Sequence, residues 1–143
     1  MNVMLLAAGQ GTRLRPYTEV IPKPAIPFLN VPLAAYSLYF IKSLDIDKLV
    51  VNTFHLPEKV HQLCNELPIS KKIQINFSDE TGFIRGSGGG LKSAEKHFTS
   101  EHILLLNSDE VTIPKDENIV AKAAEFHKKS NSLATLLVTE NPE

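Results

Sequence analysis

The sequence lacks the features that mark secreted, disulfide-stabilised or membrane-spanning chains. Its single cysteine, Cys64, has no partner for an internal disulfide, which fits a reducing cytosol. No apolar run reaches the length of a membrane span. Met1-Asn2 leads directly into an apolar stretch, without the charged region and cleavage site of a signal peptide. We therefore expect a cytoplasmic chain that has no membrane partner.

A charge bias is also absent, because 15 basic residues face 16 acidic ones. This balance gives no general attraction to nucleic acid, so no nucleic-acid partner is expected. The five histidines form no HxxxH or HExxH pair, and we assign none of them to a metal or a catalytic step. Cys64 shares an apolar helical face with Val60, Leu63 and Leu67, so we expect it in the core. The 143 residues suffice for one domain, and we see no linker.

Two well-known phosphate-binding loops are missing as well. The dinucleotide fingerprint GxGxxG requires a third glycine where this chain has Leu14, and no acidic residue closes the following strand. The Walker A pattern GxxxxGK[ST] does not occur. These absences exclude two kinds of nucleotide site and leave other forms of anion binding open.

What the chain does have is a long proline-rich loop after its first apolar strand. The strand is predicted over Val3–Ala7, and a turn of small residues follows it over Ala8–Thr12. Two spaced cations, Arg13 and Lys23, come next. The prolines that stiffen the loop are Pro16, Pro22, Pro24 and Pro27. Most loops have about 4 to 6 residues, and long ones are usually functional or disordered, so this stiffened, charged loop indicates a function.

The turn has the composition of an anion site. Gly9 and Gly11 can adopt positive φ and let the backbone approach a ligand, and successive N–H groups then form a concave anion site. Arg13 and Lys23 add full charges for phosphate oxygens. The alternative is a plain glycine turn with solvated cations, but the preceding strand and the stiffened loop favour anion binding.

Apolar periodicity predicts alternating strands and helices. The predicted strands are Val3–Ala7, Leu49–Asn52, Ile73–Phe77, Ile103–Leu106 and Leu133–Val138. The predicted helices run from Pro32 to about Leu44, from Pro57 to a stop at Pro68, from the second glycine-rich segment to about Phe98, and from about Asn118 to Lys129. This order predicts a Rossmann-like, three-layer α/β sandwich with a mainly parallel sheet. Ile73–Phe77 alternates apolar and polar residues, so we expect it toward an edge.

Ligands of parallel sheets bind at the carboxyl ends of the strands, where three unusual segments lie. They are the first loop, the glycine-rich segment Ser78–Gly90, and Asp109 after the fourth strand. Asp109 can hold Mg²⁺, which prefers oxygen ligands, or it can begin a loop turn. The glycines of Gly86–Gly90 can bring N–H groups close to a base or ribose at a helix start, or they can form a flexible loop with Ser87 as a cap. Spacing alone leaves these alternatives open.

The stretch from Leu6 to Pro32 resembles the signature of the sugar-1-phosphate nucleotidylyltransferases, whose pattern is roughly LAAGxGTRLxPxTxxxPKPxxPxxxxP. The likeness continues more loosely as far as Asp109 and is greatest for the mannose-1-phosphate guanylyltransferase type. It implies the nucleotide-diphospho-sugar transferase type of fold. It also implies that a nucleoside triphosphate and a sugar 1-phosphate give an NDP-sugar and pyrophosphate.

The resemblance implies roles for single residues. Arg13 and Lys23 are the expected catalytic residues, Arg13 at the β- and γ-phosphates and Lys23 at the α-phosphate and the sugar phosphate. Asp109 is the expected ligand of the cofactor Mg²⁺, with Glu110 as a neighbour. The expected nucleotide-binding residues are Ala8, Gly9, Gly11, Thr12, Glu80, Gly86, Ser87 and Gly88.

Glu80 stands where the family tends to carry a Gln or Glu that reads the base edge. Guanine offers a pair of donors that suits a carboxylate, so this position favours GTP, with mannose 1-phosphate or a related sugar. Uridylyltransferase or thymidylyltransferase specificity stays open. The alternative for Glu80 is a solvated loop acid.

The second half of the family's domain normally supplies the sugar contacts and a second metal-binding Asp, and neither is found in residues 1–143. We therefore expect residues 1–143 to be the nucleotide-binding N-terminal part of such a domain, without its sugar-binding half. The alternative is a nucleotide-binding or regulatory module of the same fold without catalysis. Tyr36, Tyr39 and Phe40 suit a contact between copies of the chain as well as a core, so a homo-oligomer is a further open alternative.

Overall fold

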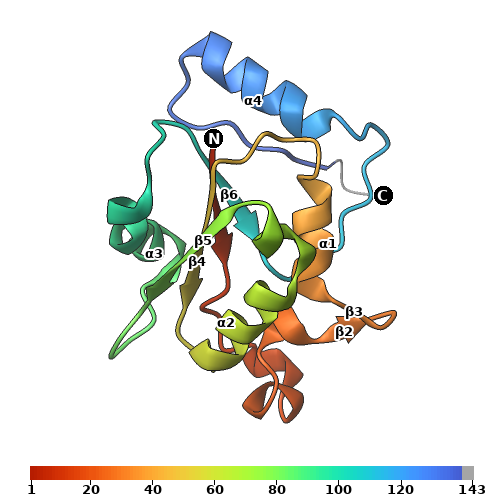
Figure 1. Ribbon diagram of the computed structural model, residues 1–143, viewed down its shortest axis with the longest axis vertical. Coiled ribbons are helices and arrows are strands. Elements are labelled where there is room, and N and C mark those ends of the chain that lie inside the picture. Colours follow the sequence, from red (N-terminus) through yellow and green to blue (C-terminus); the bar gives the residue numbers. More distant parts are fainter. Residues whose placement is uncertain (140–143) are drawn as a thin grey trace.

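The computed structural model describes residues 1–139, and its centre is a four-stranded parallel sheet. The strands lie in the order β5–β4–β1–β6 (Figure 1). Their bounds are β1 Asn2–Leu6, β4 Lys48–Thr53, β5 Gln74–Asp79 and β6 Ile103–Asn107. The predicted parallel sheet is confirmed, and so is the edge position of the alternating strand, β5. Leu6 pairs with both Asn52 and Asn107, so three strands end at the same level.

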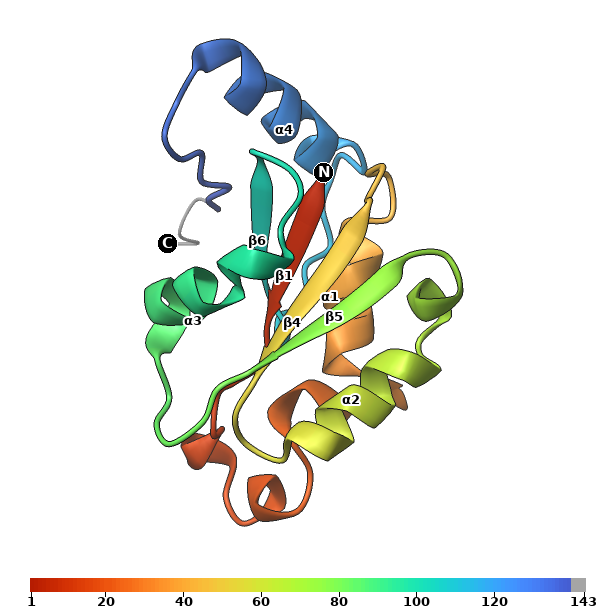
Figure 2. The same ribbon diagram turned by 60° about the vertical axis from the view of Figure 1, so that its left-hand side comes forward.

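Helices cover both faces of the sheet, as predicted for three layers. They are α1 Leu33–Phe40, α2 Pro57–Glu66, α3 Gly86–Ala94 and α4 Ile119–Ser130. Figure 2 shows α1 and α2 on one face and α3 on the other. Because neighbouring residues of a strand face opposite sides, Val3 and Leu5 of β1 pack with α1, α2 and Val120 of α4, whereas Met4 packs with Ala94 of α3. Among residues 1–139, no helix combines the length and the apolar character needed to cross a bilayer.

Helix α1 ends earlier than predicted, at Phe40 instead of about Leu44. Beyond it the chain forms four-residue turns, in which Leu44 N–H donates to the carbonyl oxygen of Ile41 over 3.0 Å. Ile41 is fully buried and Leu44 packs against the same core. The apolar spacing therefore continues past the helix because it records burial and not helical hydrogen bonding.

A short hairpin closes the proline-rich loop. It joins β2 (Pro27–Phe28) to β3 (Val31–Pro32), and its two turn residues, Leu29 and Asn30, have φ of 48° and 65°. Two-residue hairpin turns commonly use this left-handed conformation. The hydroxyl of Tyr36 in α1 donates to the carbonyl oxygen of Phe28 over 2.8 Å, which anchors the hairpin to the helix.

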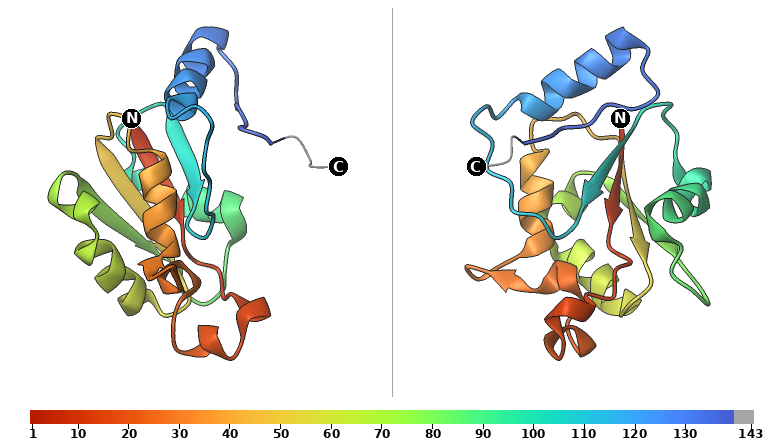
Figure 3. Two further views of the ribbon diagram at one scale, coloured as in Figure 1. Left: turned by 90° about the vertical axis from the view of Figure 1, so that its right-hand side faces the viewer. Right: turned by 180° about the vertical axis from the view of Figure 1, so that it is seen from behind.

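The predicted fifth strand, Leu133–Val138, is wrong. This segment pairs with no strand in the described part of the chain and follows α4 as an irregular stretch (Figure 3). Its apolar side chains are exposed, with Leu133 at 105% and Val138 at 83%. Alternating apolar residues favour a strand, but a strand forms only where a neighbouring backbone accepts its hydrogen bonds.

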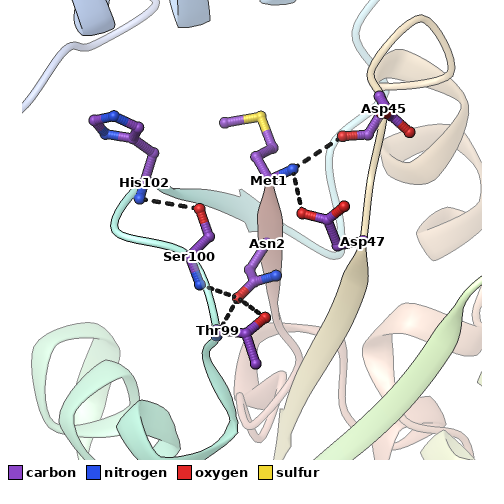
Figure 4. A network of polar contacts seen from close by, with 7 residues as sticks. All are labelled: Met1, Asn2, Asp45, Asp47, Thr99, Ser100 and His102. Carbon is purple, nitrogen blue, oxygen red and sulfur yellow. Dashed lines mark hydrogen bonds and ion pairs between the residues drawn. The ribbon is translucent and has the colours of Figure 1, made fainter.

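The amino end of β1 is held by a polar network on the side of the sheet away from the strands' carboxyl ends (Figure 4). The side-chain oxygen of the fully buried Asn2 accepts the N–H groups of Thr99 and Ser100 over 2.6 and 3.0 Å. The α-amino group of Met1 pairs with Asp47 over 2.8 Å. The network ties the start of β1 to the connection between α3 and β6 and to the start of β4.

Candidate functional site

A pocket of about 230 Å³ lies where β1, β4 and β6 end, beside the start of α3. This is the edge of the sheet at which the sequence predicts a ligand. The lining residues are Leu6, Ala7, Ala8, Gly9, Lys23, Pro24, Asn52, Ile84, Gly86, Ser87, Asn107, Ser108 and Asp109.

The turn after β1 presents backbone donors that the protein itself leaves unused. Within residues 1–139, the N–H groups of residues 8–13 donate to no protein acceptor, whereas Ala7 N–H donates to Asn52. Successive free N–H groups are the usual basis of a backbone anion site. Gly11 adopts φ of 62°, as expected, but Gly9 does not adopt positive φ.

The side chain of Thr18 braces this turn. Its hydroxyl donates to the carbonyl oxygen of Gly11 over 2.9 Å. The Nε2 atom of His55 lies 2.5 Å from the carbonyl oxygen of Thr18, and Lys59 Nζ donates to that of Val20 over 2.5 Å. Residues after β4 and in α2 therefore hold the proline-rich loop in place, which supports the interpretation of that loop as an ordered, functional segment.

Lys23 and Asp109 form an ion pair across the pocket, between the Lys23 Nζ and the Asp109 Oδ2 atoms. They are the two charged residues among those that line it. Lys23 lies in a 3₁₀ turn, Lys23–Ala25, and Asp109 follows β6, so the pair joins two segments that are 86 residues apart. The predicted phosphate-binding cation and the predicted metal-binding carboxylate thus lie in direct contact.

Hydrogen bonds to β1 and α1 hold the segment that carries Asp109. The buried Ser108 donates its hydroxyl to the carbonyl oxygen of Leu6 over 2.6 Å, and Ser37 of α1 donates to that of Glu110 over 3.1 Å. The side chain of Glu110 accepts from Asn107 over 2.6 Å. Asp109 is therefore positioned by both β1 and α1.

The donor set around Asp109 fits a Mg²⁺ ion held mainly by a substrate. Residues 1–139 contain no group of three or more His, Cys, Asp or Glu side chains that could hold a metal ion by themselves. Mg²⁺ is often bound by one or two carboxylates together with water and substrate phosphates. One carboxylate beside free backbone donors, which suit an anion, matches that pattern.

Glu80 is buried, which rules out the interpretation as a solvated loop acid. It is 6% exposed, and both of its carboxylate oxygens accept hydrogen bonds from the protein, from the side chain of Asn52 and from Arg85 N–H. The expected contact between Glu80 and a base edge stays a prediction.

Helix α3 begins at Gly86, so the glycine run lies inside its first turns and not in a loop before it. Ser87 is therefore a helical residue, and no side chain caps this helix. A Cβ atom at Gly90 would lie 2.7 Å from Asn52 Nδ2 and 2.8 Å from Glu80 Oε1. The glycine there allows the helix to lie directly against these two side chains.

The structure brings about half of the predicted site residues together. Those in the pocket lining are Ala8, Gly9, Lys23, Gly86, Ser87 and Asp109. Those outside it are Gly11, Thr12, Arg13, Glu80 and Gly88. Arg13 lies on the exposed 3₁₀ turn Thr12–Leu14, and Gly88 borders a second hollow between α3 and β6. Gly11 and Glu80 lie behind the lining. Gly11 shapes the turn after β1, and Glu80 holds the start of α3 through Arg85 N–H.

Sequence reasoning missed three polar residues of the lining: Asn52, Asn107 and Ser108. Each closes or directly follows an apolar strand, and the register places Asn52 and Asn107 on either side of Leu6. A polar residue at the carboxyl end of a buried strand was the signal that could have identified them.

Comparisons with known sequences agree with the motif. The sequence model of the nucleotidyl transferase family matches residues 2–143. A UTP–glucose-1-phosphate uridylyltransferase from Synechocystis sp. is 31% identical over 152 residues, which cover 100% of this chain and 38% of that protein. A mannose-1-phosphate guanyltransferase from Yarrowia lipolytica is 32% identical over 145 residues, which cover 100% of this chain and 39% of that protein. The chain spans about two fifths of the length of these relatives.

Solved structures share the fold. A UDP-glucose pyrophosphorylase in complex with UDP-glucose superposes with a TM-score of 0.78 at 18% identity, over 91% of this chain and 54% of that one. A UDP-glucose pyrophosphorylase from Acinetobacter baumanii gives 0.73 at 17% identity, over 92% and 53%. At such identities the likeness concerns the fold alone, and it confirms the predicted α/β class.

Proposed function

Because the chain belongs to the nucleotidyl transferase family, we propose that it forms the nucleotide-binding part of an enzyme that makes an NDP-sugar. A nucleoside triphosphate and a sugar 1-phosphate react, and pyrophosphate is released. The observation that carries this proposal is the pocket at the strand ends, where free backbone N–H groups, Lys23 and Asp109 converge.

The reaction needs positioning and charge neutralisation more than a protein nucleophile. An oxygen of the sugar phosphate attacks the α-phosphorus in line, the bond from the α-phosphorus to the bridging oxygen breaks, and that oxygen leaves with pyrophosphate. Negative charge gathers on the phosphates throughout. A site of fixed N–H groups and cations stabilises that charge without a covalent intermediate.

Each residue has a proposed part in binding. The N–H groups of Ala8 and Gly9 would hold the triphosphate, with Lys23 at the α-phosphate and the incoming sugar phosphate. Arg13, on the next turn, would reach the β- and γ-phosphates. The start of α3, at Gly86 and Ser87, would face the ribose and base, because a glycine lets the backbone come close to a ligand.

The residues present also fit the proposed cofactor. Asp109 would hold Mg²⁺, which supplies neutralisation of the triphosphate charge when it is bound. The ion pair with Lys23 keeps the Asp109 carboxylate at the pocket.

Two substrate pairs are the first to test. The names of the two relatives point to GTP with mannose 1-phosphate and to UTP with glucose 1-phosphate. The preference for GTP inferred from Glu80 stays a prediction, because each oxygen of that side chain accepts one protein hydrogen bond and can still accept another. A nucleotide panel therefore has to identify the base.

A thermal-shift panel tests the proposal on this chain, with GTP, UTP, dTTP, CTP and ATP, each with and without Mg²⁺. Ligand at about 100 times its dissociation constant stabilises by roughly 2.7 kcal/mol, which raises the midpoint by about 5 to 10 °C. We expect such a Mg²⁺-dependent shift for one nucleotide. An unfolding midpoint that stays the same with all five nucleotides contradicts the proposal.

Pyrophosphate release with mannose 1-phosphate and glucose 1-phosphate then tests catalysis. Release above background supports the enzyme. Nucleotide binding without release is expected both of the nucleotide-binding part of an enzyme and of a nucleotide-binding module, so release is the result that distinguishes them.

A further inference from the structure

Asn52 and Glu80 form a buried polar pair behind the pocket. Asn52 is 3% exposed and Glu80 is 6% exposed. The side-chain oxygen of Asn52 accepts Ala7 N–H over 2.9 Å, and its Nδ2 atom donates to Glu80 Oε1 over 2.8 Å. Glu80 Oε2 accepts Arg85 N–H over 2.7 Å. Three hydrogen bonds in series therefore join the backbone of Ala7 to the backbone of Arg85.

The two ends of this series are the two backbone segments of the site. Ala7 directly precedes the residues whose N–H groups are free, and Arg85 directly precedes Gly86, the first residue of α3. Both neighbouring segments line the pocket. A change in the pair would alter the distance between the phosphate-binding turn and the start of α3.

The neighbouring groups fix the orientation of the Asn52 and Glu80 side chains. A Cβ atom at Gly90 would lie within 2.8 Å of both side chains, so α3 rests directly on them. The amide of Asn52 is oriented by its partners, since its oxygen accepts from a backbone N–H and its nitrogen donates to a carboxylate. A buried polar group without its partner is costly, so the three bonds are expected to persist together.

We propose that Asn52 and Glu80 are positioning residues that set the two backbone segments of the nucleotide site at their working separation. Glu80 serves the site through its hydrogen bonds to Asn52 and to Arg85 N–H. This inference rests on the proposed function, because it concerns the same pocket.

Two single variants and their combination test the proposal. Asn52→Asp places two carboxylates against each other, and Glu80→Gln leaves one of its two partners without a matching group. The double variant N52D/E80Q reverses the central hydrogen bond. The glutamine amide at position 80 then donates to the aspartate at position 52, its oxygen accepts Arg85 N–H, and the aspartate still accepts Ala7 N–H. The double variant also keeps the net charge of the wild type.

The readouts are the dissociation constants for GTP and UTP and the hydrogen exchange of the Ala7 and Arg85 amides. We expect each single variant to weaken both nucleotides by the same factor, about tenfold to a hundredfold, and to speed exchange at Ala7 or Arg85. The double variant is expected to restore affinity and protection to within about threefold of wild type.

Several results would overturn the proposal. A changed ratio of GTP to UTP affinity in Glu80→Gln that Asn52→Asp does not correct would assign Glu80 to the base edge. Fast exchange of either amide in the wild-type chain would show that the series of bonds does not hold, even if a variant fails to fold. No nucleotide binding by the wild-type chain would contradict the proposed function itself, whereas binding without rescue contradicts only the positioning role.

Discussion

Gly11 shows how a single residue decides the geometry of the turn after β1. Its φ of 62° lies in the left-handed region, and a Cβ atom there would lie 2.8 Å from Thr18 Cγ2. Thr18 is held in turn by its hydrogen bond to Gly11 and by His55. Neither the backbone nor the neighbouring side chain can yield without breaking these contacts.

Gly11→Ala is therefore expected to lower the free energy of unfolding by about 1 to 3 kcal/mol, as measured by urea denaturation. The matched control is Gly9→Ala. Gly9 does not adopt positive φ and has no atom within 4 Å of a Cβ position, so a change within about 0.5 kcal/mol is expected. Equal losses in the two variants would show that Gly11 has no special conformational role.

At the scale of the elements, α2 and β5 are joined by a polar contact at the end of the sheet. Asp79 of β5 accepts hydrogen bonds from Thr53 over 2.5 Å and from His61 of α2 over 2.8 Å. Partial burial raises the pKa of Asp79, but these two hydrogen bonds and the positive charge of His61 together lower it by more, so the pKa lies below its ordinary value of 3.8. The folded chain thus favours the charged carboxylate. The contact therefore stabilises the folded state at pH values above the ordinary pKa.

This stabilisation is lost as the pH falls below that ordinary value. Asp79→Asn is expected to lower the free energy of unfolding at pH 7 by less than about 1 kcal/mol, because the side chain is half exposed. The difference from wild type should vanish near about pH 2. Urea denaturation at both pH values measures it, and a difference of the same size at each pH would refute the assignment.

The packing of α2 on the sheet has a chemical consequence at Cys64. Burial raises the pKa of this thiol to about 12. At about pH 9 the folded chain is expected to react with iodoacetamide at least about a hundredfold more slowly than the same chain in urea, because the thiolate is the reactive form. Similar rates in both states would mean that α2 opens readily.

On the scale of the whole molecule, the pocket exists only because distant segments end at one edge of the sheet. Lys23 and Asp109 meet there although they are 86 residues apart. Their side chains are 27% and 28% exposed, so the pair is partly screened by water. We expect this ion pair to contribute mainly to ligand binding and little to the stability of the fold.

Lys23→Ala is accordingly expected to weaken nucleotide binding by at least about tenfold while the free energy of unfolding changes by less than about 1 kcal/mol. Titration calorimetry and urea denaturation measure the two effects. Lys122→Ala is the matched control, because Lys122 also pairs with an aspartate, Asp116, away from the pocket. The same loss of affinity in both variants would show that Lys23 does not contact the nucleotide.

The sequence by itself determined the class of the fold and the edge of the sheet at which the pocket lies. Apolar runs specify buried strands, their alternation with helices requires parallel pairing, and parallel pairing gathers the strand ends. The motif from Leu6 to Pro32 was specific enough to indicate the family that the comparisons then showed. These signals are local in the chain, which is why they can be read without coordinates.

Only the tertiary structure decided which polar groups meet. It buried Glu80 against Asn52, paired Lys23 with Asp109, and left Leu133–Val138 without a strand partner. The physical reason is that a polar side chain or a strand backbone needs a hydrogen-bonding partner, but the local pattern does not specify which distant group supplies it. Periodicity records burial along one element, whereas the site is made of contacts between elements.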